Sequence, residues 1–266
     1  SEIIYFLNQQ RSLLALQKAE KMKKQAFADR YPYGIFSCIR TMGHIYKSRG
    51  NFDLSAQYYQ EALDYMLKNM PDQDPSQLYS SLAEYYRNTQ KDYATALDYC
   101  EKALKSAKTE RNIAQAMIEK CLVLFRQGRI DEFNDCYKEA VQMADRCKLS
   151  ASVSLLIAHI SKNILDKQYE QAHAHADQLS EEGLQQHAYI YECAKDYPNA
   201  IKYLKKYHQQ LDSTNNLLQL SDIAELNTQI GAERLKMENI QATSRYRITL
   251  FSIVTGFLLL SLLFLM

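Results

Sequence analysis

The sequence FSCIRTMGHIYKSRGNFDLSAQYYQEALDYML, residues 36–67, has the pattern of two helices joined by a tight turn. Small residues occur where the two helices must touch, with Gly43 in the first helix and Ser55 and Ala62 in the second. The large residues expected to fill the spaces around them are Ile39, Met42, Tyr46, Phe52 and Tyr59. A helical pair of this kind cannot bury its apolar face alone and needs copies of itself stacked alongside. The stretch therefore predicts an array of helical hairpins.

Further copies of this pattern follow along the chain. We predict hairpins over about residues 1–27, 31–69, 76–108, 111–147, 151–181 and 182–211. The position of Gly43 is taken in turn by Ala83, Cys121, Ile160 and Ala188, at intervals of about 40, 38, 39 and 28 residues. Ile160 departs from the small-residue pattern, so the hairpin over 151–181 is the weakest copy. The recurrence as a whole predicts a repeat architecture.

The recurring residues resemble the tetratricopeptide repeat, whose signature is a bulky residue, then Leu-Gly, then Tyr, and later Ala, an aromatic residue and Ala. Gly43 and Tyr46 match the first half of this signature, and Ala96 and Ala103 match the second half in the next copy. The resemblance covers about residues 12–211, although no Trp opens any copy and the usual closing Pro is missing. It implies an all-α fold, a right-handed superhelical solenoid with a concave protein-binding groove.

Composition agrees with a helical fold and narrows the class of partner. Only seven Gly and four Pro occur among 266 residues, which favours a nearly all-helical chain. The formal net charge of +1 gives no reason to expect nucleic acid as a partner. The six cysteines are spread widely, and no two are close enough in sequence to indicate a zinc knuckle or a redox dithiol. We expect buried core thiols, which weigh against a strongly oxidising compartment.

The sequence contains no recognisable catalytic or metal-binding arrangement. It lacks a Gly-rich phosphate loop and a Gly-x-Ser-x-Gly nucleophile elbow. His173 and His175 lie two positions apart, so on a helix they point away from each other and cannot form a metal-binding pair. We therefore predict that this stretch is not an enzyme and that it uses no cofactor or metal.

The predicted groove is lined by the outward positions of each first helix. These positions carry Arg40, His44 and Lys47 in the first hairpin, Glu84, Arg87 and Asn88 in the next, and Leu122, Phe125 and Arg126 in the third. A basic rim beside an aromatic residue suits an acidic peptide or a C-terminal carboxylate. The alternative is a solvated face that binds nothing.

Beyond the repeats, residues 212–245 have the pattern of a long linker helix. Its apolar positions follow a short heptad run: Ile223, Leu226, Ile230, Met237 and Ile240. One interpretation is a homodimeric coiled coil. The other is a helix that caps the last repeat, because terminal repeats need a polar outer face.

We predict a transmembrane helix over residues 246–266. Residues 248–266 contain no charged side chain and are long enough to cross the hydrocarbon core of a bilayer. Arg245, Tyr246 and Arg247 form an interfacial collar. The sequence begins at Ser1 without Met and shows no signal peptide, so we expect that the native start has been removed.

The order of repeats, heptad helix and apolar span resembles the input half of bacterial tetratricopeptide sensor histidine kinases and related membrane-bound regulators. That resemblance implies periplasmic repeats on the inner membrane, a ligand or protein in the groove, and a kinase or DNA-binding module after the span. The alternative is a tail-anchored cytosolic adaptor, which the basic residues Arg245 and Arg247 on the repeat side favour. A third interpretation is a soluble scaffold whose apolar tail packs into a partner.

Overall fold

The computed structural model describes residues 11–149, 152–180 and 182–223, together with residues 228, 235, 236, 239 and 243. The chain divides into two units, Ser1–Asn216 and Leu217–Met266. Every regular element in the described residues is a helix, so the predicted all-α class is confirmed. Within those residues, no helix combines the length and the apolar character needed to cross a bilayer.

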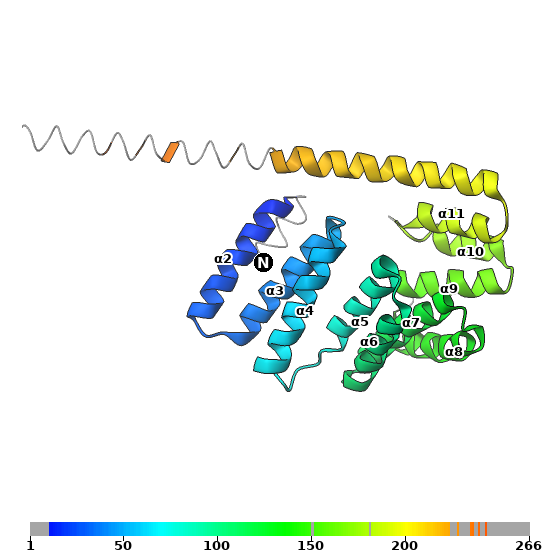
Figure 1. The fold of residues 1–266 in the computed structure, drawn as a ribbon, viewed down its shortest axis with the longest axis horizontal. Coiled ribbons are helices and arrows are strands. Elements are labelled where there is room, and N and C mark those ends of the chain that lie inside the picture. Colours follow the sequence, from blue (N-terminus) through cyan, green and yellow to red (C-terminus); the bar gives the residue numbers. More distant parts are fainter. Residues whose placement is uncertain are drawn as a thin grey trace, which may run out of the picture. The chain divides into compact units, whose positions relative to one another are not determined.

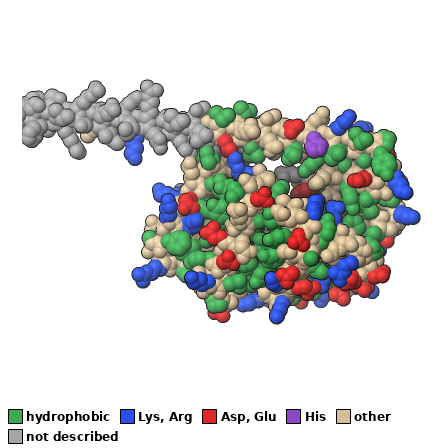
Figure 2. All heavy atoms as spheres, viewed as in Figure 1, with side chains coloured by type: hydrophobic (Ala, Val, Ile, Leu, Met, Phe, Trp, Pro, Cys, Tyr) green, Lys and Arg blue, Asp and Glu red, His purple; other side chains and the backbone are tan. Residues whose placement is uncertain are grey.

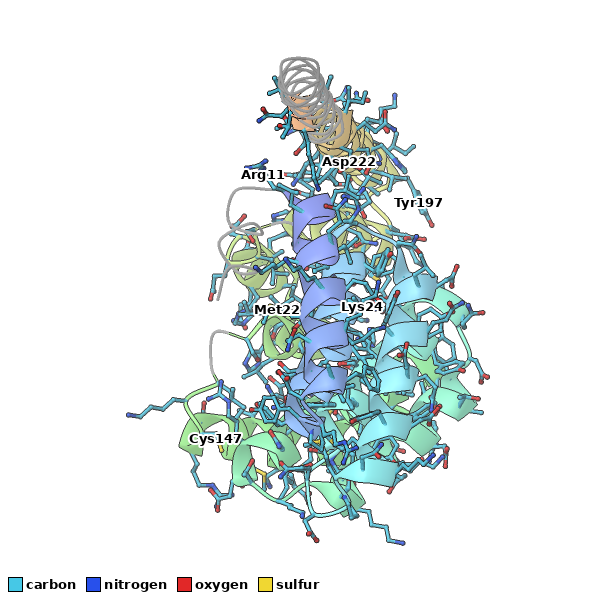
Figure 3. All side chains as sticks on the ribbon, turned by 90° about the vertical axis from the view of Figure 1, so that its left-hand side faces the viewer. Arg11, Met22, Lys24, Cys147, Tyr197 and Asp222 are labelled. Atoms are coloured by element: carbon cyan, nitrogen blue, oxygen red, sulfur yellow. The ribbon has the colours of Figure 1, made fainter. Side chains whose placement is uncertain are left out.

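The first unit is a series of helices that pack in chain order (Figure 1). The elements are α2 (Ser12–Ala28), α3 (Pro32–Ser48), α4 (Phe52–Asn69), α5 (Ser76–Tyr85), the π-helix η1 (Tyr86–Gln90), α6 (Tyr93–Ser106), α7 (Glu110–Gln127), α8 (Ile130–Arg146), α9 (Val153–Leu165), α10 (Tyr169–Ala176) and α11 (Gly183–Cys193). The pairs α3–α4, α5–α6, α7–α8 and α9–α10 are in direct contact. The helix α2 packs against α3 and lies at the edge of the array, where Figure 3 shows it in front with Met22 and Lys24 on its surface.

The turns between paired helices form where the sequence predicts them. Gly50 and Gly128 have φ angles of +71° and +73°, a left-handed conformation that glycine adopts without a steric penalty. Asn51 then begins α4, because its side chain accepts a hydrogen bond from the backbone N–H of Leu54. Pro32 occupies the first turn of α3, where its missing N–H needs no partner. The tight turn predicted within residues 36–67 is therefore confirmed, and Gly128 forms the corresponding turn between α7 and α8.

The turn of the second hairpin contains one more residue than that of the first, and the structure shows how it is accommodated. After Tyr85 the chain continues as η1, in which each hydrogen bond spans one residue more than in an α-helix. Lys91 follows with a φ of +57°, and Asp92 caps α6 by accepting a hydrogen bond from the N–H of Thr95. The longer turn is thus accommodated by the π-helix and by the left-handed Lys91.

The small residues do hold the paired helices close together. A Cβ atom added to Gly43 would lie 2.7 Å from Cε1 of Tyr59 on α4. Ala83 and Cys121, at the matching positions of α5 and α7, are fully buried. Ile160 is also buried in α9, and it packs in one cluster with Ala172 and Ala176 of α10. In that hairpin the small residues lie on the second helix, so the larger side chain fits on the first.

Three large residues expected in the interior lie at the surface instead. Phe52 is the first residue of α4, and its side chain points back toward the turn rather than into the helix pair. Tyr197, which is 58% exposed, and Leu204 belong to the last helical stretch of the first unit, residues 197–216. Figure 3 shows Tyr197 pointing away from the neighbouring helices. Within the first unit no further hairpin follows to cover these two side chains.

The predicted boundary at residue 212 falls within the helical residues 197–216 of the first unit. Residues 217–223 of the second unit are also helical, and Ile223 is exposed there. The other linker residues, Leu226, Ile230, Met237 and Ile240, lie outside the described residues, as do the collar Arg245, Tyr246 and Arg247 and the predicted span 248–266.

Candidate protein-interaction face

The first helices of successive hairpins form a continuous surface in the first unit. Helix α5 contacts α7, α7 contacts α9, and α9 contacts α11, while Lys47 of α3 reaches Glu84 of α5. We call this surface the first-helix face. Its polar and aromatic residues are Arg40, His44, Lys47, Glu84, Arg87, Asn88, Glu119, Phe125 and Arg126. Helical-repeat proteins bind their partners on surfaces of this kind.

An ion pair joins the first two hairpins across this face. Nζ of Lys47 lies 2.6 Å from Oε2 of Glu84, and both side chains are partly exposed. Burial acts against the charge on Lys47, but the Glu84 carboxylate and its hydrogen bond raise the pKa of the lysine overall. The pair is therefore charged on both sides and neutral as a whole. Partly exposed pairs contribute about 0–1 kcal/mol to stability, so a ligand can open this one at little cost.

A second ion pair joins the next two hairpins and is buried. Nε and Nη2 of Arg87 in η1 donate to the two carboxylate oxygens of Glu119 in α7, at 2.6 and 3.3 Å. The side chains are only 5% and 6% exposed. Burial raises the pKa of Glu119, while the Arg87 guanidinium acts in the opposite direction. Nη1 of Arg87 donates to Oδ1 of Asn88 at 2.6 Å, which leaves the guanidinium fully engaged.

Arg87 was predicted to line an exposed groove, and that prediction is wrong. Arg87 lies four positions after the buried Ala83, and positions i and i+4 share one face of a helix, so its side chain points inward. Phe125, four positions after the buried Cys121, turns inward in the same way. Leu122 was placed on the same exposed face and is also buried. Asn88, by contrast, is exposed as expected.

The α3 part of the face carries a cation close to an aromatic residue. The guanidinium of Arg40 lies 5.5 Å from the ring centroid of Phe36, and its buried Nε has no hydrogen-bond partner among the described residues. One turn further on, Nδ1 of His44 lies 3.0 Å from the hydroxyl of Tyr59. Desolvation, followed by the charges of Arg40 and Lys47, lowers the pKa of His44. Near neutral pH the imidazole is therefore uncharged.

The far end of the face brings α7 and α11 together. The guanidinium of Arg126 lies 4.8 Å from the ring centroid of Tyr189, a residue of α11. Burial raises the pKa of Tyr189 to about 12, so its phenol stays neutral. The predicted neighbour Phe125 turns inward, where its ring centroid lies 5.6 Å from that of Phe133. Of the two neighbours Phe125 and Arg126, Arg126 is therefore exposed, and Phe125 packs partly into the core.

The sequence argument did not find a set of stacked histidines across α9, α10 and α11. The ring of His175 stacks on His159 with centroids 5.0 Å apart, and the ring of His173 stacks on His187 at 4.9 Å. Nδ1 of His159 also lies 2.6 Å from the hydroxyl of Tyr137. His173 and His175 do point to opposite neighbours, as their spacing predicts. The partner of His175 lies on the other helix of the same hairpin, whereas the partner of His173 lies on α11 of the next one.

The two hollows found on the surface of the described residues lie away from the first-helix face. One is lined by Phe27 and Tyr65 together with polar residues of α4. The other is lined by residues of α6, α7 and α8, including Cys136 and Lys120. No group of His, Cys, Asp or Glu side chains in the described part of the chain has an arrangement that could hold a metal ion. On the side seen in Figure 2, basic and acidic side chains are intermingled over the described residues.

Comparison with known proteins supports a helical-repeat fold. Residues 40–74 match the family described as tetratricopeptide repeat. No curated protein matches the sequence significantly. Among solved structures, PilW, a widely conserved type IV pilus biogenesis factor, is similar over 79% of this chain and 90% of its own, with 14% identity and a TM-score of 0.51. This likeness concerns the fold alone.

Two further structures resemble the chain at lower TM-scores. BtubC (BKLC) from P. vanneervenii has 16% identity and a TM-score of 0.48, over 75% of this chain and 91% of its own. Aspartyl phosphate phosphatase F from Bacillus subtilis has 17% identity and a TM-score of 0.48, over 78% of this chain and 68% of its own. Residues 40–74 thus match the tetratricopeptide repeat family, and the fold of the chain is similar to that of PilW.

Proposed function

We propose that this chain is a protein-binding module that holds a segment of a partner protein along the first-helix face. The observation that carries the proposal is the pair of links Lys47–Glu84 and Arg87–Glu119. The buried Arg87–Glu119 pair ties η1 to α7 and restricts how these two elements move, while the partly exposed Lys47–Glu84 pair bridges α3 and α5. A surface organised before binding loses less conformational entropy when a ligand arrives.

The chemistry of the face favours an acidic segment or a C-terminal carboxylate. Lys47 and Arg87 are neutralised by their glutamates. Arg40 and Arg126 form no ion pair with a described residue, and each lies against an aromatic ring. A guanidinium in this setting can bind a carboxylate through two parallel hydrogen bonds. Asn88 lies between the two arginines along the chain and supplies an exposed amide.

Site-specific photocross-linking in cells tests this proposal. A benzophenone amino acid placed at Asn88 or at Arg126 should capture the same partner protein. The matched control is Lys102, which is exposed on α6, a second helix, and should capture none. Capture from Lys102 at a yield equal to that from Asn88 would show that the first-helix face is not the binding surface.

We also propose that the module is the input half of a single-pass membrane signalling protein, with the repeats periplasmic and the output a kinase or DNA-binding module. The support is the sequence order: the heptad positions from Ile223 to Ile240, then the uncharged residues 248–266. Binding would shift the packing of two linker helices in a homodimer, and the span would relay the change.

One observation favours a different membrane protein, a tail-anchored cytosolic adaptor. Arg245 and Arg247 precede residues 248–266, and basic residues collect on the cytoplasmic side of a membrane span. A Lys102→Cys variant of a chain lacking the native cysteines distinguishes the two orientations. Labelling by a membrane-impermeant maleimide in cells with a permeabilised outer membrane supports the sensor. Labelling only after lysis supports the adaptor, and release of the chain by carbonate extraction contradicts both.

A further inference from the structure

Cys121 of α7 and Cys136 of α8 face each other across one hairpin. Their Sγ atoms are 2.8 Å apart, and the thiol of Cys121 donates a hydrogen bond to Cys136. This separation is about 0.8 Å longer than a covalent S–S bond of about 2.05 Å. The two residues are 15 positions apart in sequence, on opposite sides of the turn at Gly128 and Arg129. Joining the sulfurs therefore requires no rearrangement of the two helices.

The two thiols differ in access to solvent. Cys121 is fully buried, with 0% of its surface exposed. Cys136 is half-buried and lines the hollow between α6, α7 and α8, together with the ammonium-bearing Lys120. A small oxidant can therefore reach Cys136 from solvent, whereas Cys121 lies behind it.

The two thiols also differ in acidity. The hydrogen bond from Cys121, helped by the charge of Lys120, lowers the pKa of Cys136, although burial acts against it. The same hydrogen bond and burial raise the pKa of Cys121. The thiolate is the form of cysteine that reacts with peroxides.

We propose that Cys121 and Cys136 form a peroxide-sensitive dithiol, in which Cys136 is oxidised first and Cys121 then closes a disulfide. In the first step the Cys136 thiolate attacks hydrogen peroxide, the O–O bond breaks, and a sulfenic acid and hydroxide form. In the second step the sulfur of Cys121 attacks the sulfenic sulfur, the S–O bond breaks, and water leaves with the thiol proton. Two electrons pass from the thiols to the peroxide, and a thiol reductant reverses the change.

The disulfide would fix α7 against α8. Helix α7 also carries Glu119 and Phe125 of the first-helix face, so the cross-link lies directly behind that face. Closing a loop of about 15 residues restricts the unfolded chain, and the midpoint of thermal unfolding should rise by roughly 5–10 °C on oxidation.

Peptide mapping of the full chain, purified in detergent and treated with hydrogen peroxide, tests the proposal. Trypsin separates Cys121 and Cys136 into the peptides 121–126 and 130–138, because Lys120, Arg126, Arg129 and Lys138 flank them. After free thiols are blocked with a maleimide, the two peptides should appear joined, with a mass two hydrogens below their sum. Cys147, half-buried at the end of α8, should remain alkylated and serves as the internal control.

Two variants separate the roles of the thiols. Cys121→Ala should stop at the sulfenic acid on Cys136, which dimedone traps, and should form no disulfide. Cys136→Ala should leave Cys121 unoxidised under the same conditions. The proposal is overturned if the wild-type peptides remain separate and alkylated, if Cys136 ends as a sulfinic acid, or if Cys147 is oxidised equally fast. The wild-type mapping decides the question even if a variant does not fold.

Discussion

The carboxylate of Glu119 accepts hydrogen bonds at 2.6 and 3.3 Å from the guanidinium of Arg87, and almost none of either side chain is exposed to solvent. The pair joins η1 of one hairpin to α7 of the next, so it lies at a junction between repeats. Removing two charges from water is costly, and a buried pair of this kind is a weak source of net stability. Its role here is geometric, because it sets how neighbouring first helices meet.

Replacing one residue of this pair should lower the free energy of unfolding far more than replacing both residues. We expect Arg87→Met to lower the free energy of unfolding by about 3–5 kcal/mol, since it leaves the Glu119 carboxylate buried without its partner. The double variant Arg87→Met with Glu119→Leu should recover most of that loss, because no buried charge remains. Urea unfolding followed by circular dichroism measures both. A double variant as unstable as the sum of the two single variants would contradict this account of the pair.

Gly43 should be intolerant of a single added methyl group. In Gly43→Ala the new Cβ would lie 2.7 Å from the ring of Tyr59, whose hydroxyl is held by His44. The steric strain should outweigh the better helix propensity of alanine, so the free energy of unfolding should fall by about 1–2 kcal/mol.

Gly34→Ala in the same helix is the matched control. Its Cβ would meet the exposed ring of Tyr31 at 2.5 Å, which can rotate away, and Cβ of Ala26 at 3.1 Å, which needs a shift of only a few tenths of an ångström. The unfolding free energy of this variant should stay within about 0.5 kcal/mol of the wild type. If Gly43→Ala and Gly34→Ala lowered the unfolding free energy equally, α3 and α4 would not be in close contact at Gly43.

Stability should fall as the pH drops below neutrality because of three histidines that are partly shielded from solvent. Burial is the main cause that lowers the pKa values of His44, His159 and His173, and each histidine is further disfavoured as a cation by a neighbouring basic side chain or histidine. The folded chain keeps these rings neutral, while the unfolded chain protonates them near the ordinary pKa of 6.5. The unfolded state therefore binds more protons below pH 6.5, and the free energy of unfolding decreases there.

Unfolding free energies measured between pH 5 and pH 8 check this dependence. His159→Gln removes one of the three groups and should make the decline shallower, whereas His208→Gln, at an exposed position, should leave it unchanged. A stability that rises on acidification, or an equal slope in the two variants, would show that the histidines do not control it.

The fold could be predicted because it depends on features that repeat along the chain. Small residues at the positions of Gly43, Ala83 and Cys121 mark where helices touch, and Gly50 and Gly128 mark where they turn. Each of these signals is local, so one sequence is enough to reveal it. The hairpin with Ile160 was judged the weakest copy although Ala172 and Ala176 kept the repeat pattern, and these two alanines do pack in one cluster with Ile160.

The candidate site was predicted less well, because it depends on pairings between helices. Arg87 was misplaced because its position one helical turn after the contact residue Ala83 was not taken into account. The cysteine pair was dismissed on sequence distance alone. A usable signal did exist, because Cys121 and Cys136 are equally far from the turn at Gly128 and Arg129, and such positions face each other in an antiparallel hairpin. His159 and His175 carry the same signal, because they are equally far from the turn at Lys167 within one hairpin. His173 and His187 carry none, since α10 and α11 belong to successive hairpins.

The most direct measurement is amide hydrogen exchange on the chain with and without the partner captured by cross-linking. The account predicts slower exchange in α3, α5 and α7, where Arg40, Asn88 and Arg126 lie on or next to the first helices, and unchanged exchange in α4, α6 and α8. Protection confined to α4, α6 and α8 at saturating partner would contradict the central claim that the first helices form the binding surface.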